Sequence, residues 1–147
     1  MALEKAIQLR PGFAEAENQL GLVMTRSGER AAAEHYFRSA IVAAPSYAEA
    51  ANNLGTLLGQ EGRDREAEAV LRSAVSANPR FGQAWVNIAA TLASESKFAE
   101  ARAAVESALR IDPNDKNALG LRDMLAGAAS GEPSVSNPHK ACAGRPQ

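Results

Sequence analysis

The most reactive side chains in this sequence are His35, His139 and Cys142. A nucleophile needs a base and an orienting group beside it in a rigid site, and a metal ion needs several ligands at a suitable spacing. His35 falls in a segment with helical periodicity, whereas His139 and Cys142 fall in a stretch rich in Gly, Ser and Pro. We therefore do not expect the three to meet, and the sequence predicts no enzyme active site, no metal site and no cofactor.

Amide side chains form a second chemical pattern. Asn53 and Asn87 are 34 residues apart, and Gln19 precedes Asn53 by the same interval. An amide both donates and accepts hydrogen bonds, so a row of amides can bind the backbone of an extended peptide whatever its side chains. Each contact contributes on the order of 1 kcal/mol. Whether the amides form a row depends on the elements that carry them.

The interval of 34 residues recurs along the chain. It separates four prolines, which are Pro11, Pro45, Pro79 and Pro113. Within each unit, apolar residues lie three or four apart in two stretches, which predicts two amphipathic helices rather than strands. A small residue on the first helix of each unit, Gly21, Gly55 or Ala89, is expected to let the two helices of a pair approach closely.

The turn between the two helices of a unit contains Gly28 or Gly62, which can adopt the left-handed conformation that ends a helix. The third unit has Ser96 in this register, so we expect a local energetic cost but no change of fold. Asp64 is predicted to be the N-cap of the second helix in its unit.

This helix-turn-helix period resembles the tetratricopeptide repeat (TPR), whose signature is W-x2-L-G-x2-Y, then A-x3-F, then P. Trp85 and Ile88, the pair Leu20-Gly21, and Ala33-x3-Phe37 match parts of it. The resemblance implies an all-α fold, a right-handed α-α superhelix (TPR solenoid), in which the first helices line a concave groove. It consists of three full helix pairs, a leading half-repeat helix and a C-terminal capping helix.

We expect the array to span residues 1–126. Its parts are the half repeat 1–13, repeats 14–47, 48–81 and 82–115, and the capping helix 116–126. Arg122 and Asp123 replace the Leu-Gly pair in the last helix, which marks it as a cap. Residues 127–147 are rich in Gly, Ser, Pro and Ala without periodicity, which predicts a disordered tail. The incomplete first unit indicates either a piece of a longer array or an open edge that pairs with a second chain.

The resemblance implies that ligand contacts lie on the first helices. The predicted peptide-binding residues are polar and uncharged: Gln19, Asn52, Asn53, Thr56, Gln60, Gln83 and Asn87. The amide row is similar to the asparagine ladder of O-linked N-acetylglucosamine transferases, which implies binding of an extended peptide. The family's two-carboxylate clamp needs cations in the first and third repeats. Since Asn18 and Leu22 occupy the first of these places and Gln83 and Asn87 the last, we do not expect that mode.

Charge and hydropathy exclude other classes of partner. Sixteen basic and seventeen acidic residues give a net charge of -1, too little to attract nucleic acid or anionic lipid. Pentatricopeptide arrays, the nearest RNA-binding alternative, need a cationic groove that this sequence does not provide. No apolar run approaches the roughly 20 residues of a membrane span, and the first ten residues do not resemble a signal peptide.

These observations predict a cytoplasmic protein-protein interaction scaffold that is not an enzyme and binds a peptide or protein segment in its groove. Nucleic acid and membranes are not expected as partners. Two alternatives remain open. The chain is the substrate-recruiting part of a larger enzyme such as a glycosyltransferase, or it forms a homo-oligomer through an open N-terminal edge.

Overall fold

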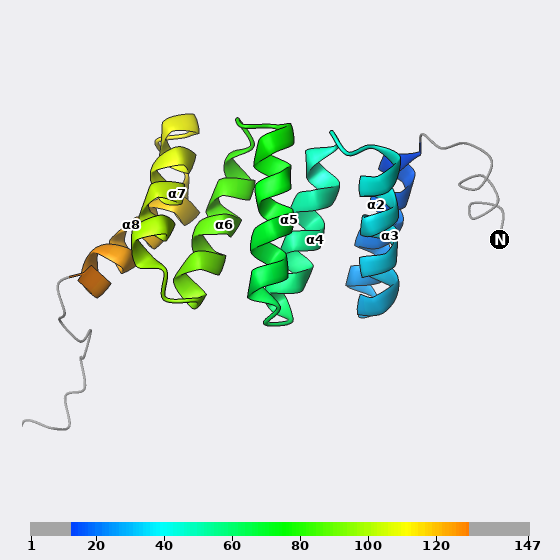
Figure 1. Ribbon diagram of the computed structural model, residues 1–147, viewed down its shortest axis with the longest axis horizontal. Helices are drawn as coiled ribbons and strands as arrows, with labels where there is room; N and C mark the ends of the chain where they lie inside the picture. Colours follow the sequence, from blue (N-terminus) through cyan, green and yellow to red (C-terminus); the bar gives the residue numbers. More distant parts are fainter. Residues whose placement is uncertain (1–12, 130–147) are drawn as a thin grey trace, which may run out of the picture.

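The structure, a computed structural model, describes residues 13–129, which form seven α-helices and no strand. The helices are α2 (Ala14–Arg26), α3 (Arg30–Ala43), α4 (Ala48–Gln60), α5 (Asp64–Ala77), α6 (Gly82–Ser94), α7 (Phe98–Ile111) and α8 (Lys116–Ala129). They follow one another along the long axis of the molecule in chain order (Figure 1). The prediction of an all-α solenoid is confirmed, while the expected leading helix falls outside the described residues except for Phe13.

Each of the three expected repeats contains one helix pair: α2 with α3, α4 with α5, and α6 with α7. The first helices α2, α4, α6 and α8 also contact one another in succession, whereas successive second helices make few or no direct contacts. The first helices therefore form the inner side of the curve. Helix α8 ends at Ala129, three residues beyond the expected end, and the rest of the predicted tail lies outside the described residues.

The two helices of a pair approach each other most closely at the small residues of the first helix. A Cβ atom on Gly21 would lie 2.5 Å from Phe37 Cε1, and one on Gly55 would collide with Leu71 Cγ. Phe37 and Leu71 are each only 1% exposed. In the third pair Ala89 replaces the glycine, and the smaller Val105 stands in the register of Phe37 and Leu71. The close approach expected from the sequence is thus present.

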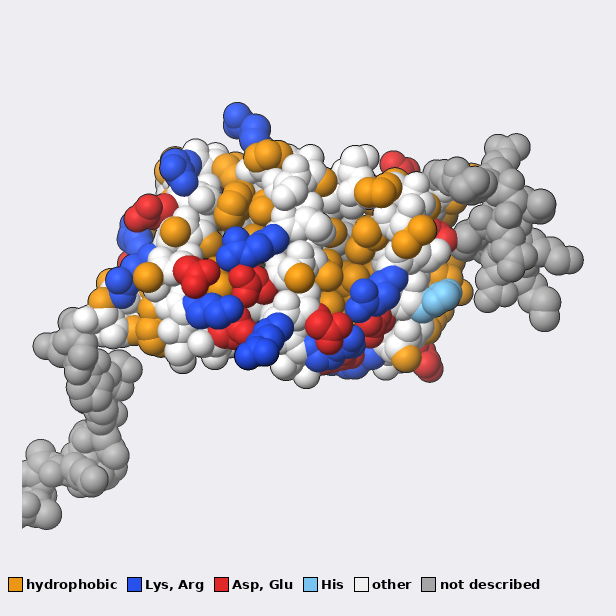
Figure 2. Space-filling view, in the orientation of Figure 1, with side chains coloured by type: hydrophobic (Ala, Val, Ile, Leu, Met, Phe, Trp, Pro, Cys, Tyr) orange, Lys and Arg blue, Asp and Glu red, His pale blue; other side chains and the backbone are white. Residues whose placement is uncertain are grey.

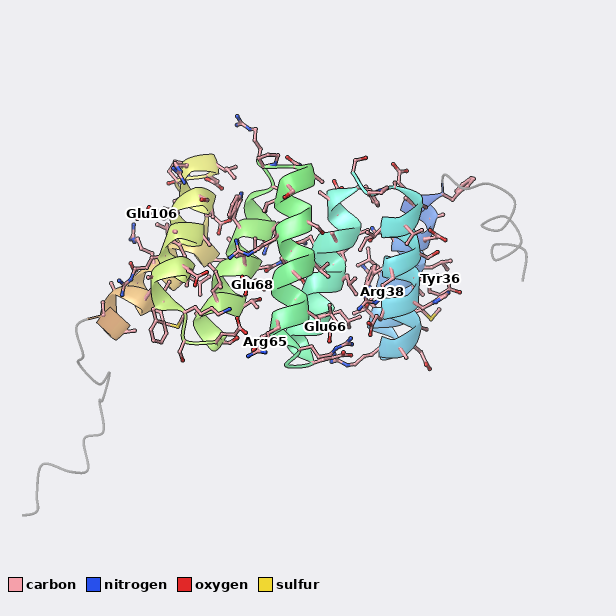
Figure 3. The ribbon with its side chains drawn as sticks, in the orientation of Figure 1. Tyr36, Arg38, Arg65, Glu66, Glu68 and Glu106 are labelled. Atoms are coloured by element: carbon pink, nitrogen blue, oxygen red, sulfur yellow. The ribbon has the colours of Figure 1, made fainter. Side chains whose placement is uncertain are left out.

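Glutamates on the second helices form ion pairs with the following repeat. Glu34 Oε2 lies 2.7 Å from Arg63 Nη1, and the equivalent Glu68 Oε2 lies 3.0 Å from Lys97 Nζ. Arg38 and Glu66 add a further contact of 3.5 Å between α3 and α5. Figures 2 and 3 show cations and carboxylates intermingled across this face. The charges here are mostly neutralised by each other.

These ion pairs should make stability depend on pH. Hydrogen bonds from Arg63 and then Arg38 lower the pKa of Glu34 below its usual value. A carboxylate with a lowered folded pKa stabilises the fold above its unfolded pKa of about 4.3, and the contribution disappears as the pH falls through the folded pKa.

We expect Glu34→Gln to lower the free energy of unfolding at pH 7 and to lose less stability than the wild type between pH 5 and pH 3. Urea denaturation at each pH measures this. The control is Glu106→Gln on α7 (Figure 3), which removes a carboxylate without an ion pair among residues 13–129. Its stability should change with pH in the same way as that of the wild type.

The turns inside the three repeats share a left-handed residue. Gly28 has φ 80°, Gly62 has φ 73° and Ser96 has φ 61°. Ser96 is the only residue other than glycine with a positive φ between residues 13 and 129. A side chain in this region of φ is strained by roughly 1 kcal/mol, so the cost expected at the third turn is located at Ser96.

Relief of this strain is measurable. We expect Ser96→Gly to raise the free energy of unfolding by about 0.5–1 kcal/mol, since glycine adopts this conformation without steric conflict. The matched exchange Gly62→Ser should lower it by a similar amount. Urea denaturation of the three proteins tests both, and a Ser96→Gly protein no more stable than the wild type would contradict the interpretation.

Candidate peptide-binding groove

A pocket of about 530 Å³ lies on the first helices α4 and α6 where they meet the start of α5. It is lined by Gly55, Thr56, Gly59, Gln60, Gly62, Asp64, Leu71, Asn87, Ala90, Thr91 and Ser94. Three of the predicted binding residues, Thr56, Gln60 and Asn87, are among them. We call this pocket, with the inner faces of α4 and α6 around it, the groove.

Amide pairs join successive first helices. Asn53 Nδ2 donates to Asn18 Oδ1 at 2.9 Å, and Asn87 Nδ2 donates to Asn52 Oδ1 at 2.9 Å. The two bonds are equivalent, because 34 residues separate Asn18 from Asn52 as well as Asn53 from Asn87. The amides therefore hold α2 to α4 and α4 to α6.

The structure corrects the expectation for Asn52, which is only 8% exposed and accepts the bond from Asn87. Asn87 is also bonded within the stack, because its Nδ2 donates to Thr56 Oγ1 at 3.1 Å and its Oδ1 accepts one bond from Gln83 at 3.3 Å. Both asparagines stabilise the stack. In the expected row of amides, the amide protons of Asn87 are therefore not free to bind a peptide.

Asn53, Gln19 and Gln60 keep free hydrogen-bonding atoms. Asn53 is half-buried, and its Oδ1 has no hydrogen-bond partner among residues 13–129. Gln19 and Gln60 are exposed, and their amides have no partner in the same part of the chain. Gln19 lies on α2 and does not line the pocket.

Two polar residues that line the pocket, Thr91 and Asp64, were not among the residues expected to face a ligand. Thr91 and Ser94 occupy the last turns of α6, and Asp64 begins α5. Asp64 does not cap the helix as predicted, because Arg63 is the N-cap and no side chain there makes a capping bond. Its Oδ2 instead accepts a hydrogen bond of 2.8 Å from Ser94 Oγ.

The threonine hydroxyls of the pocket are held by the backbone. Thr56 Oγ1 donates to the carbonyl oxygen of Asn52 at 2.9 Å, and Thr91 Oγ1 donates to that of Asn87 at 2.9 Å. Such bonds to the residue four positions earlier fix the side-chain rotamer. Their oxygens therefore have fixed positions at the groove surface.

The support for the amides extends to Tyr47, before α4. Asn18 is 3% exposed, and its Nδ2 donates to the Tyr47 hydroxyl at 3.3 Å. Burial, and secondly the charge of Glu49, raise the pKa of Tyr47 above its usual value. The hydroxyl that accepts from Asn18 therefore ionises less readily than a free phenol.

The reactive residues of the sequence are not brought together in the described part of the chain. His35 is exposed on α3, with its ring edge-on to Tyr36 at 5.6 Å between centroids, and His139 and Cys142 lie outside residues 13–129. Between these limits no group of three His, Cys, Asp or Glu residues could hold a metal ion. The described helices are also too short or too polar to cross a bilayer.

The amide pairs lead to a prediction about stability. Asn87→Ala leaves Asn52 Oδ1 without its partner, so we expect the free energy of unfolding to fall by about 1–2 kcal/mol. Gln19→Ala removes an exposed amide without a partner and should change it by less than about 0.5 kcal/mol. Urea denaturation distinguishes the two. Equal stability of Asn87→Ala and the wild type would show that the amide pair does not stabilise the stack.

Two family models match the chain. The tetratricopeptide repeat model matches residues 52–116, and a model described as the Est1 DNA/RNA binding domain matches residues 3–80. Both include the helix pair α4 and α5 in whole or in large part. The search of curated proteins gave no significant match.

Solved TPR structures are similar to this chain over most of its length. MamA aligns with a TM-score of 0.79 and 20% identity, covering 88% of this chain and 75% of that one. The first TPR of Spaghetti (RPAP3), bound to the HSP90 peptide SRMEEVD, aligns with a TM-score of 0.77 and 20% identity over 80% and 93%.

A third similar structure is the second TPR domain of human RPAP3 in complex with the HSP70 peptide SGPTIEEVD. It aligns with a TM-score of 0.76 and 19% identity over 80% of this chain and 98% of that one. At such identities the likeness shows the fold. Together with the 34-residue period, the paired helices and the repeat model over residues 52–116, it shows that the described helices form an array of tetratricopeptide repeats.

Proposed function

We propose that the chain is a protein-interaction scaffold that binds an extended peptide segment in the groove between α4 and α6. The observation that carries this proposal is the pocket of about 530 Å³. Glycines and an alanine leave it room for a backbone, and Gln60, Asn87 and the two threonines surround it with polar atoms. Peptides bound to similar TPR domains support the proposal.

Nucleic acid is a second candidate, because one matching family model is described as a DNA/RNA binding domain. A protein ligand fits the groove better. The one charged residue that lines the pocket is Asp64, which repels phosphate, and Arg63 and Lys97 nearby are already paired with glutamates. Phosphate binding requires unpaired cations.

The proposal is tested by blocking the groove. Random 12-residue peptides are displayed on phage and selected on the wild-type chain, and the affinities of enriched peptides are measured by fluorescence anisotropy. Ala90 is exposed and lines the pocket, so we expect Ala90→Arg to weaken these peptides at least about tenfold by filling the space. Ala103→Arg, an exposed position in the middle of α7, is the matched control and should bind normally.

Melting curves verify that both variants are folded. If the enriched peptides bind Ala90→Arg as tightly as the wild type, the ligand site is elsewhere and the proposal is wrong. Labelled oligo(dT) and oligo(U) of 20 nucleotides are measured in parallel. Micromolar binding that weakens steeply with salt would favour the nucleic-acid candidate.

The alternative of a substrate-recruiting part of a larger enzyme uses the same groove. It therefore predicts the same loss of peptide binding in Ala90→Arg. What distinguishes it is a covalently attached catalytic domain in the full-length gene product, which sequencing of the complete transcript would reveal.

A further inference from the structure

The pocket of the groove presents hydrogen-bond acceptors almost exclusively. A hydroxyl has one proton to donate, and those of Thr56, Thr91 and Ser94 already go to acceptors within the protein. Ser94 also approaches the Thr91 carbonyl oxygen at 2.8 Å, so its single proton is shared between two internal acceptors. The three oxygens therefore offer only lone pairs to a ligand.

The amides of the pocket add little donor capacity. Both amide protons of Asn87 are used, one toward Asn52 and one toward Thr56. Gln60 is the one lining side chain whose donors have no partner among residues 13–129. It is exposed at the end of α4, where it can turn toward solvent.

The charge of the pocket, like its hydrogen-bond acceptors, favours a ligand that donates protons. Asp64 is half-buried, and its Oδ1 has no hydrogen-bond partner in the described part of the chain. Arg63 is occupied by Glu34, Glu61 and Glu66. The next residue, Arg65, lines a neighbouring hollow of about 360 Å³ that Asp64 also borders, but it forms no ion pair with Asp64. A negative charge and several lone pairs thus face the same space without a counterion.

We infer that the groove selects a peptide with a basic side chain, and that this lysine or arginine enters the pocket between α4 and α6 to meet Asp64. The inference rests on the proposed function and specifies its ligand. An ammonium or guanidinium group carries three to five donors and no acceptor, so it complements a site with the opposite character. Acidic peptides such as SRMEEVD would place carboxylates against lone pairs and find no cation among the lining residues.

The test is a double-mutant cycle on peptides enriched from the random library. One substitution is Asp64→Asn, which keeps the shape and an acceptor for Ser94 but removes the charge, and the other replaces the basic residue of the peptide with Gln. We expect Lys and Arg to be enriched, each single change to weaken binding about fivefold, and the second change to have little effect once the first is made. Glu106→Gln removes one carboxylate from α7, where Glu106 lines a separate hollow beside α8, and should leave affinity unchanged.

The outcomes separate this inference from the proposed function. Additive effects of the two substitutions, or enriched peptides without basic residues that still lose affinity on Ala90→Arg, overturn the inference and leave the groove as the binding site. Peptides that are insensitive to Ala90→Arg overturn both. Circular dichroism verifies that Asp64→Asn is folded, and the peptide substitution provides a measurement on the unaltered protein.

Discussion

The close contact between the two helices of each repeat is the constraint on which the structure depends. Gly21 and Gly55 have no side chain at the points where Phe37 and Leu71 fill the space. Because the large side chain lies under the first helix, that helix is held against its partner and its other face remains available to the next first helix. Stacking of the pairs, curvature and groove all follow from this spacing.

The polar side chains of the inner face serve the stack as well as the groove. Asn52 and Asn87 join α4 to α6, and the hydroxyl of Thr56 accepts from the same amide. A chain of this kind satisfies most of its own donors, as a partly buried polar network must. What remains for a ligand is set by the atoms left over, which in the pocket are oxygens apart from the amide of Gln60.

The period, the helix pairs and the close approach could be predicted because they depend on residues within one unit. The roles of Asn52 and Asn87 could not, because they arise from a contact 35 residues apart along the chain between helices of different repeats. The role of Asp64 was missed for the same reason, since its partner Ser94 belongs to the next unit. Glu17 stands where the family signature has tryptophan, yet it is 3% exposed and accepts a bond of 2.6 Å from Ser39. The repeat pattern contains no information on that pairing.

The internally bonded hydroxyls of the pocket also affect how tightly any ligand can be held. Thr56, Thr91 and Ser94 are already restricted in rotation before binding, so the protein loses little side-chain entropy when the pocket is filled. Most of the ordering cost then falls on the peptide. Between two ligands with the same contacts, the one already extended in solution, for example by flanking prolines, therefore binds more tightly.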